Sequence, residues 1–174
     1  MSNPAKRKGD HFEREAVRSL VQVAPDLVIA GARRKLGAGR HDDVGDIDAI
    51  AGVTIQVRAL RDVSKALRSA ANDASKQGKN AQTDWSIGLV PILRARPGTP
   101  RWIVSTLHWP GDPCTPPKTV SRTADAVKLL RSAGLESPIV VVDRAGQELM
   151  YVSTLETWVS SIRTKFTHSS MYGR

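Results

Sequence analysis

The chain has 174 residues, of which 26 are Lys or Arg and 17 are Asp or Glu, so its formal net charge is +9. This length suits one domain with a substantial core. The positive charge favours a polyanionic partner such as nucleic acid, although a basic surface can also serve solubility alone. No apolar run approaches the roughly 20 residues of a membrane-spanning helix, and a single cysteine suits a reducing compartment. We therefore expect a cytoplasmic protein without a membrane segment.

The N-terminal region predicts a basic arm over residues 1–8 that ends at Lys8, followed by a helix over residues 9–23. Glu13 lies on the apolar stripe of this helix. A carboxylate on a buried face is costly unless it is paired or binds a metal. Alternatively, Glu13 lies at the edge of the stripe near the first turn, where the helix dipole favours a negative charge.

A strand over residues 27–30 is predicted next, followed over residues 31–41 by a glycine-spaced basic loop. Such a loop can follow a phosphate backbone, or it can be simply a solvated charged segment. The basic residues of this loop are Arg33, Arg34, Lys35 and Arg40.

An acidic hairpin is predicted from residues 45–50 and 53–60, with its turn at residues 51–52. Side chains alternate between the two faces of a strand, so Gln56 and Arg58 point the same way. They could form part of a site, or they could be the solvent face of an edge strand.

The register of this hairpin decides whether Asp46 joins Gln56 and Arg58. A two-residue turn would pair Asp46 with Val57, on the wrong face of the strand. A three-residue loop would instead pair Asp46 with Arg58. The same loop would pair Asp48 with Gln56. A shared site therefore requires the longer loop, a bulge, or Asp46 lying beyond the regular ladder.

The second half of the chain alternates between helical and strand patterns. A helix rich in alanine on one face also carries Lys65 and Arg68. The elements predicted from residue 61 onward are a helix over 61–79, strands over 86–93 and 101–107, a helix over 123–133, strands over 139–142 and 148–152, and a helix over 155–162.

Together these elements predict an α/β domain over residues 9–162, with a central mixed sheet flanked by helices. We divide it into a core over residues 9–107 and a C-terminal αββα extension over residues 108–162. Residues 163–174 are polar and are predicted to be a flexible tail.

Several of these residues have the chemistry of a metal site. Hydrolysis of a phosphodiester needs a divalent cation, and Mg²⁺ prefers oxygen ligands and keeps several waters. Mn²⁺ is the natural substitute. The candidate ligands are Asp46, with Asp48 as its alternative, Glu13 from the first helix, the side-chain oxygen of Gln56 and the backbone carbonyl of Val57.

Two short motifs carry a resemblance to a known family. The helix start Lys8-Gly9-x-x-x-Glu13 resembles archaeal-type Holliday junction resolvases, and Gly45-Asp46-Ile47 followed by a Gln-x-Arg strand is similar to the PD-(D/E)xK nuclease superfamily in phage-encoded resolvase-like proteins. The resemblance covers residues 8–107. It implies a restriction-endonuclease-like core, cleavage of branched DNA such as Holliday junctions, a homodimer, and host cytoplasm if the chain is phage-encoded.

The resemblance also implies which residues act. The implied catalytic residues are Glu13, Asp46, Gln56 and Arg58, and the predicted DNA-contacting residues are Lys8, Arg33, Arg34, Lys35, Arg40, Lys65 and Arg68.

Two of these positions depart from the usual motif. Gln56 stands where the superfamily usually has Glu, and Gln at this position is found in the similar Mrr-like nucleases. The site thereby loses one negative charge that would hold a dication. Arg58 stands where the superfamily has Lys, and it can grip a phosphate with two donors but cannot readily deprotonate. The alternative function is therefore a catalytically impaired nuclease fold that serves as a DNA-binding or protein-interaction module.

Overall fold

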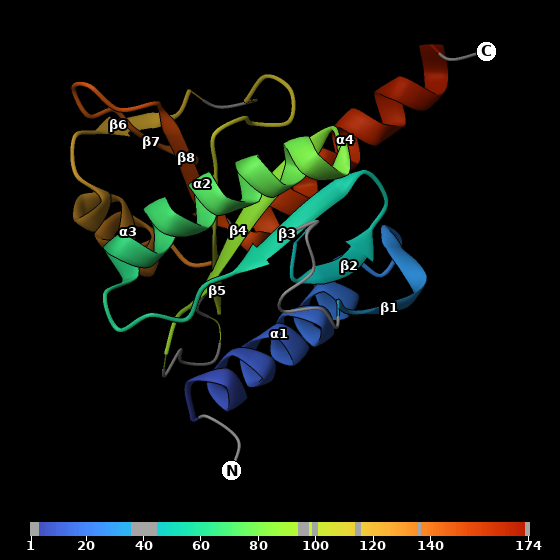
Figure 1. Cartoon of the computed structure of the whole chain (residues 1–174). Helices are drawn as coiled ribbons and strands as arrows, with labels where there is room; N and C mark the ends of the chain where they lie inside the picture. The colour runs from blue at the N-terminus through green and yellow to red at the C-terminus, as the bar shows by residue number, and fades with distance from the viewer. Residues whose placement is uncertain are drawn as a thin grey trace.

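The computed structural model describes residues 4–35, 45–93, 98, 101–113, 116–135 and 137–172. These residues form four helices and eight strands (Figure 1). In chain order they are α1 (Pro4–Val23), β1 (Val28–Arg34), β2 (Ile47–Ile50), β3 (Val53–Val57), α2 (Val63–Ala81), β4 (Trp85–Pro91), β5 (Trp102–Thr106), β6 (Lys118–Val120), α3 (Thr123–Ser132), β7 (Val140–Val142), β8 (Met150–Thr154) and α4 (Leu155–Tyr172).

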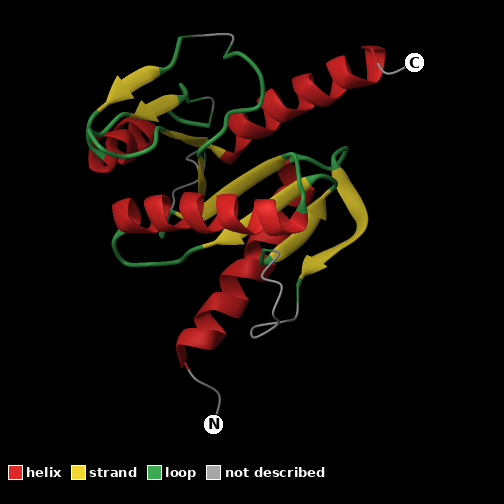
Figure 2. Ribbon diagram, turned by 45° about the horizontal axis from the view of Figure 1, so that its top comes forward, coloured by secondary structure: helices red, strands yellow, loops and turns green. Residues whose placement is uncertain are grey.

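The strands make one sheet in the order β1-β2-β3-β4-β5-β8-β7-β6. The sheet is mixed, because β3 runs parallel to β4 and β6 parallel to β7, while the other neighbours are antiparallel. Helices cover both faces, with α1 and α4 against one hydrophobic cluster and α2 and α3 against the other (Figure 2). The prediction of an α/β fold with a mixed sheet flanked by helices is confirmed, whereas the restriction-endonuclease-like core stays a prediction.

The alanine-rich face of α2 lets this helix lie close on the sheet (Figure 1). It packs against β3, β4 and β5 through small buried side chains such as Ala66, Ala70 and Ala74. On the other face, the indole Nε1 of Trp102 donates to the Ser19 hydroxyl at 2.8 Å, which joins β5 to α1 in the buried interior. The two helices are thus held in defined positions on opposite faces of β3.

The chain enters the first helix earlier than predicted. Because α1 begins at Pro4, the prediction of a separate basic arm is wrong for residues 4–8. Proline suits the first helical position, where its missing N–H would have had no partner anyway, and Ala5 and the basic residues that follow it favour a helix. Lys8 is an exposed residue of this helix.

The first strand is also longer than predicted and takes up the first four residues of the glycine-spaced loop. It runs to Arg34, and its pairing with β2 shifts register between Val28 and Arg33. Gly31 lies inside this irregular stretch with φ of +80°, a conformation that glycine adopts without strain. The predicted loop is therefore wrong for residues 31–34, and Arg40 lies outside the described residues.

The C-terminal region continues the sheet and is not appended to it. β8 pairs with β5, and β7 pairs with β8. The strand β6 directly follows Pro116 and Pro117. Sequence patterns missed it because this three-residue strand has no apolar alternation and is mostly exposed. The prediction of an αββα extension therefore omitted one strand, β6.

The predicted flexible tail is wrong for residues 163–172, because α4 continues to Tyr172. Arg163 donates from Nε and Nη2 to the two carboxylate oxygens of Asp26, at 2.7 and 2.6 Å. These hydrogen bonds lower the pKa of Asp26 and connect α4 to the turn between α1 and β1. The contact is remote in sequence, so no local pattern predicts it.

Glu156 makes the stability of the fold dependent on pH. Its Oε2 is buried and has no hydrogen-bond partner in the described part of the chain, and burial raises its pKa. The folded state therefore keeps a proton that the unfolded state releases at lower pH, so stability is greatest below the ordinary pKa of glutamate and falls as pH rises past it.

We expect Glu156→Gln to raise the free energy of unfolding at about pH 7 and to change it much less at about pH 4, where both states are largely protonated. Urea denaturation of the native protein and the variant at both pH values measures this difference. An equal effect of the substitution at the two pH values would contradict the assignment.

Candidate active site

Asp46 reaches the end of β3 through a glycine turn. Gly45 has φ of +97°, and a Cβ there would lie 3.0 Å from Thr54 Cγ2 and 3.1 Å from the carbonyl oxygen of Ile55. The amide of Asp46 donates to that carbonyl at 2.9 Å. Its carboxylate Oδ2 accepts from the N–H of Val57 at 2.9 Å. The carboxylate is thereby attached to the last residue of β3.

The hairpin register differs from both predicted pairings. Ile47 lies opposite Ile55, and the regular ladder ends there. Asp46 precedes β2 and lies beyond the ladder, which is the third possibility that the sequence left open. Asp48 lies in β2 opposite Arg33 of β1, so these two side chains share a face of the sheet.

Gln56 is part of the sheet interior. Its side chain is 1 % exposed. The strand β3 lies between β2 and β4, and Gln56 lies opposite Gly88 of β4. The interpretation of Gln56 as the solvent face of an edge strand is wrong. Its Oε1 has no hydrogen-bond partner among the described residues. A buried amide oxygen without a partner is costly, and this is the atom predicted to face a cation.

Arg58 follows β3 and is hydrogen-bonded through both its backbone and its guanidinium. Its backbone N–H donates to the carbonyl of Leu89 on β4 at 3.0 Å. Its guanidinium donates from Nε and Nη2 to Oδ2 of Asp73 on α2, at 3.0 and 2.8 Å. The hydroxyl of Ser69 donates to the same carboxylate oxygen at 3.2 Å.

Sequence reasoning missed Asp73 as a residue of this site. A signal was present, because Ser69 and Asp73 are one helical turn apart and flank the alanine face of α2. That spacing places both beside the sheet, but it does not say which strand residue they meet.

Glu13 has a different partner from the one predicted. It lies on α1, which covers the face of the sheet opposite α2, and its Oε2 accepts from Arg34 Nε at 2.8 Å. Nη2 of Arg34 donates to Asp10. Although burial opposes it, the two carboxylates raise the pKa of Arg34. Among the described contacts, none joins Glu13 to Asp46.

The predicted DNA-contacting residues are spread over several elements. Lys8 on α1, Arg33 on β1 and Lys65 on α2 are exposed. Arg68 donates from Nη1 to the carbonyl of Glu148 at 2.9 Å, and burial together with the nearby Arg144 lowers its pKa.

Lys35 and Arg34 are more closely integrated into the fold. The N–H of Lys35 donates to the carbonyl of Asp46 at 2.7 Å, directly beside the candidate site. Arg34 is engaged by the two carboxylates of α1.

The oxygen atoms at the end of β3 fit a divalent cation only in part. They are the carboxylate of Asp46, Oε1 of Gln56 and the backbone carbonyl of Val57, and one of the three groups is charged. Within the described ranges, no three His, Cys, Asp or Glu side chains are grouped so that they could share a metal ion. Mg²⁺ is often held by one or two carboxylates together with substrate phosphates. One carboxylate and two neutral oxygens would therefore hold a dication only together with further oxygen ligands from a substrate.

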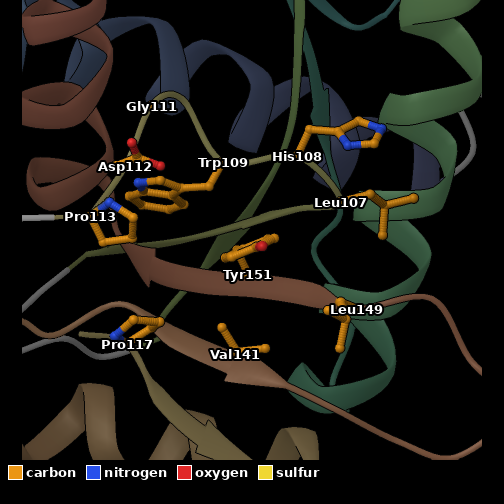
Figure 3. Close-up of a pocket in the computed structure, with 10 residues that line it drawn as sticks. All are labelled: Leu107, His108, Trp109, Gly111, Asp112, Pro113, Pro117, Val141, Leu149 and Tyr151. Atoms are coloured by element: carbon orange, nitrogen blue, oxygen red, sulfur yellow. The ribbon is translucent and has the colours of Figure 1, made fainter. Parts of the chain in front are cut away.

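A separate hollow lies at the ends of β5 and β8, with a volume of about 460 Å³. Figure 3 shows the ring of Trp109 beside Pro113, with the ring of Tyr151 among the other lining residues. The two aromatic ring centroids are 6.1 Å apart. The lining mixes aromatic, aliphatic and acidic side chains, and none of the residues predicted for catalysis lies in it.

Comparison with protein-family models, with curated proteins and with solved structures finds no match for this chain. No helix in the part of the chain that the structure describes is long and apolar enough to cross a membrane. The fold and site define an α/β protein with a carboxylate, a buried amide and a guanidinium at the end of one central strand.

Proposed function

We propose that this protein is a divalent-metal-dependent DNA endonuclease that hydrolyses phosphodiesters in branched DNA such as Holliday junctions. The observation that supports the proposal is the hydrogen bond from Val57 N–H to Asp46, which brings a carboxylate to the backbone of the residue between Gln56 and Arg58. The mixed sheet with helices on both faces is in keeping with the restriction-endonuclease-like core that the resemblance implies.

In this proposal the residues at the end of β3 have distinct roles. Asp46, Gln56 Oε1 and the carbonyl of Val57 would hold Mg²⁺ or Mn²⁺, which neutralises phosphate charge and lowers the pKa of a bound water. Arg58 would bind a phosphate through its planar fork of donors. The net charge of +9 favours DNA as the partner. A homodimer would match the twofold symmetry of a junction.

A second candidate is a nuclease fold with impaired catalysis that serves as a DNA-binding or protein-interaction module. Two observations favour it. Arg58 is ion-paired with Asp73, and Glu13 is ion-paired with Arg34. Of the carboxylates predicted as metal ligands, Asp46 is therefore the one hydrogen-bonded at the end of β3. A site that holds a dication needs more negative charge than this.

Incubation of a four-way junction with Mg²⁺ or Mn²⁺ separates the two candidates. We expect the native protein to cut the junction faster than a linear duplex of the same length. The comparison protein is Gln56→Glu combined with Arg58→Lys, which restores the usual residues of the motif. The matched control is Gln147→Glu with Arg144→Lys, the same chemical changes on an exposed turn.

Cleavage by the restored variant alone would favour the impaired fold. If neither protein cuts but both bind DNA, with an affinity that falls steeply between about 50 and 200 mM salt, the binding module is supported. Absence of DNA binding at low salt would contradict the endonuclease and the DNA-binding module, and would leave only the protein-interaction module.

A further inference from the structure

The ion pair between Arg58 and Asp73 uses only one edge of the guanidinium. Nε and Nη2 both donate to Asp73 Oδ2. A guanidinium has five N–H donors in one plane, so the end-on edge, made by Nη1 and the second hydrogen of Nη2, remains available. The printed side-chain hydrogen bonds of Arg58 among the described residues use Nε and Nη2 and leave out Nη1, and 38 % of the Arg58 side chain is exposed.

The pair also fixes the direction in which that edge points. The backbone of Arg58 is hydrogen-bonded to Leu89 on β4, and its side chain is bonded to a carboxylate on the rigid helix α2. Ser69 donates to the same carboxylate oxygen at 3.2 Å, which orients the acceptor. An arginine in solution has several rotatable bonds, and ordering them costs conformational entropy when a ligand binds. Here that ordering is already present before binding.

Ion pairs this exposed contribute little to folding stability. Stabilisation of the fold alone is therefore a poor explanation for the Arg58–Asp73 pair. A bidentate contact between a guanidinium and a phosphate depends strongly on orientation, because two parallel hydrogen bonds must form together.

We propose that Asp73, supported by Ser69, is a positioning residue that presents the end-on edge of Arg58 to a DNA phosphate at the end of β3. This inference rests on the proposed function, since it requires DNA to reach β3. Asp73 itself lies behind the guanidinium and does not touch the phosphate.

A double-mutant cycle on DNA affinity tests the role without depending on cleavage. The proteins are native, Arg58→Ala, Asp73→Ala and the double variant, and the measurement is the dissociation constant for a four-way junction at fixed salt. Asp84→Ala is the matched control, because it removes one carboxylate from an exposed residue with no ion pair among the described contacts. Alanine favours a helix, so Asp73→Ala should fold, and thermal denaturation checks this.

We expect Arg58→Ala to weaken binding about tenfold in the native background and at most about threefold when Asp73 is alanine. In the Asp84→Ala background the loss should remain about tenfold.

Two results would overturn the inference while leaving DNA binding intact. If Arg58→Ala weakens DNA binding as much or more in the Asp73→Ala background than in the native background, the Asp73 carboxylate either plays no part in binding or competes with the phosphate. If Arg58→Ala leaves DNA affinity unchanged in the native background, Arg58 does not contact a phosphate. Failure of the native protein to bind DNA at all would instead overturn the proposed function.

Discussion

Gly88→Ala should lower the free energy of unfolding by about 3 kcal/mol, a large effect for one methyl group. A Cβ at this position would lie 2.4 Å from Cβ of Ala70, 2.6 Å from its carbonyl carbon and 2.9 Å from its oxygen. Two of these atoms are backbone atoms of α2 and cannot rotate away. The helix would have to lift from β4, and Ala66 and Ala74 would lose contact with the sheet.

A second glycine provides the matched control. Gly9 lies within α1, and among the described residues its added Cβ would meet only Glu13 Oε1, at 3.9 Å. Gly9→Ala should therefore raise the free energy of unfolding by about 0.5 to 1 kcal/mol, because glycine is a poor residue for a helix interior. Urea denaturation of the three proteins measures both effects. Equal stability of Gly88→Ala and the native protein would show that α2 does not lie as close to β4 as described.

Asp46→Asn should reduce the rate of metal-dependent junction cleavage about a hundredfold to a thousandfold. The amide keeps an oxygen that can accept from Val57 N–H, so the turn into β2 is retained while the charge that would hold the cation is lost. Asp46→Ala removes the acceptor as well and leaves the buried N–H of Val57 without a partner. We expect it to lower the free energy of unfolding by about 1 to 3 kcal/mol in addition.

Asp48→Asn is the control for the Asp46 experiment, because it makes the same change of charge two residues away, in β2. Single-turnover cleavage and DNA affinity should both stay within a few fold of the native values. If Asp48→Asn abolishes cleavage and Asp46→Asn does not, the metal ligand has been assigned to the wrong aspartate.

Much of the secondary structure follows from local patterns. The spacing of alanines predicts α2, and the result agrees with Val63–Ala81 to within two residues. Strand alternation places Gln56 and Arg58 on one face of β3, and both are found on the α2 side. These inferences succeed because the helical and strand periods are properties of neighbouring residues.

The candidate site was only partly predictable. The approach of Asp46 to β3 was one of three possibilities, and the structure selects it through the left-handed turn at Gly45 and the hydrogen bond to Val57. Sequence could not supply this choice, because a shift of one residue in the register changes the face of every side chain. The late strands posed a similar problem, since β8 pairs with β5 across a separation of about fifty residues.

Composition and local periodicity are enough to predict the α/β class, the basic charge and the residue types at the end of β3. The partners of those residues depend on how the helices pack on the sheet. The tertiary structure pairs Glu13 with Arg34 on one face of the sheet and Arg58 with Asp73 on the other. Charged groups far apart in sequence meet only after the helices pack, and each then takes the oppositely charged group that packing brings within hydrogen-bonding distance.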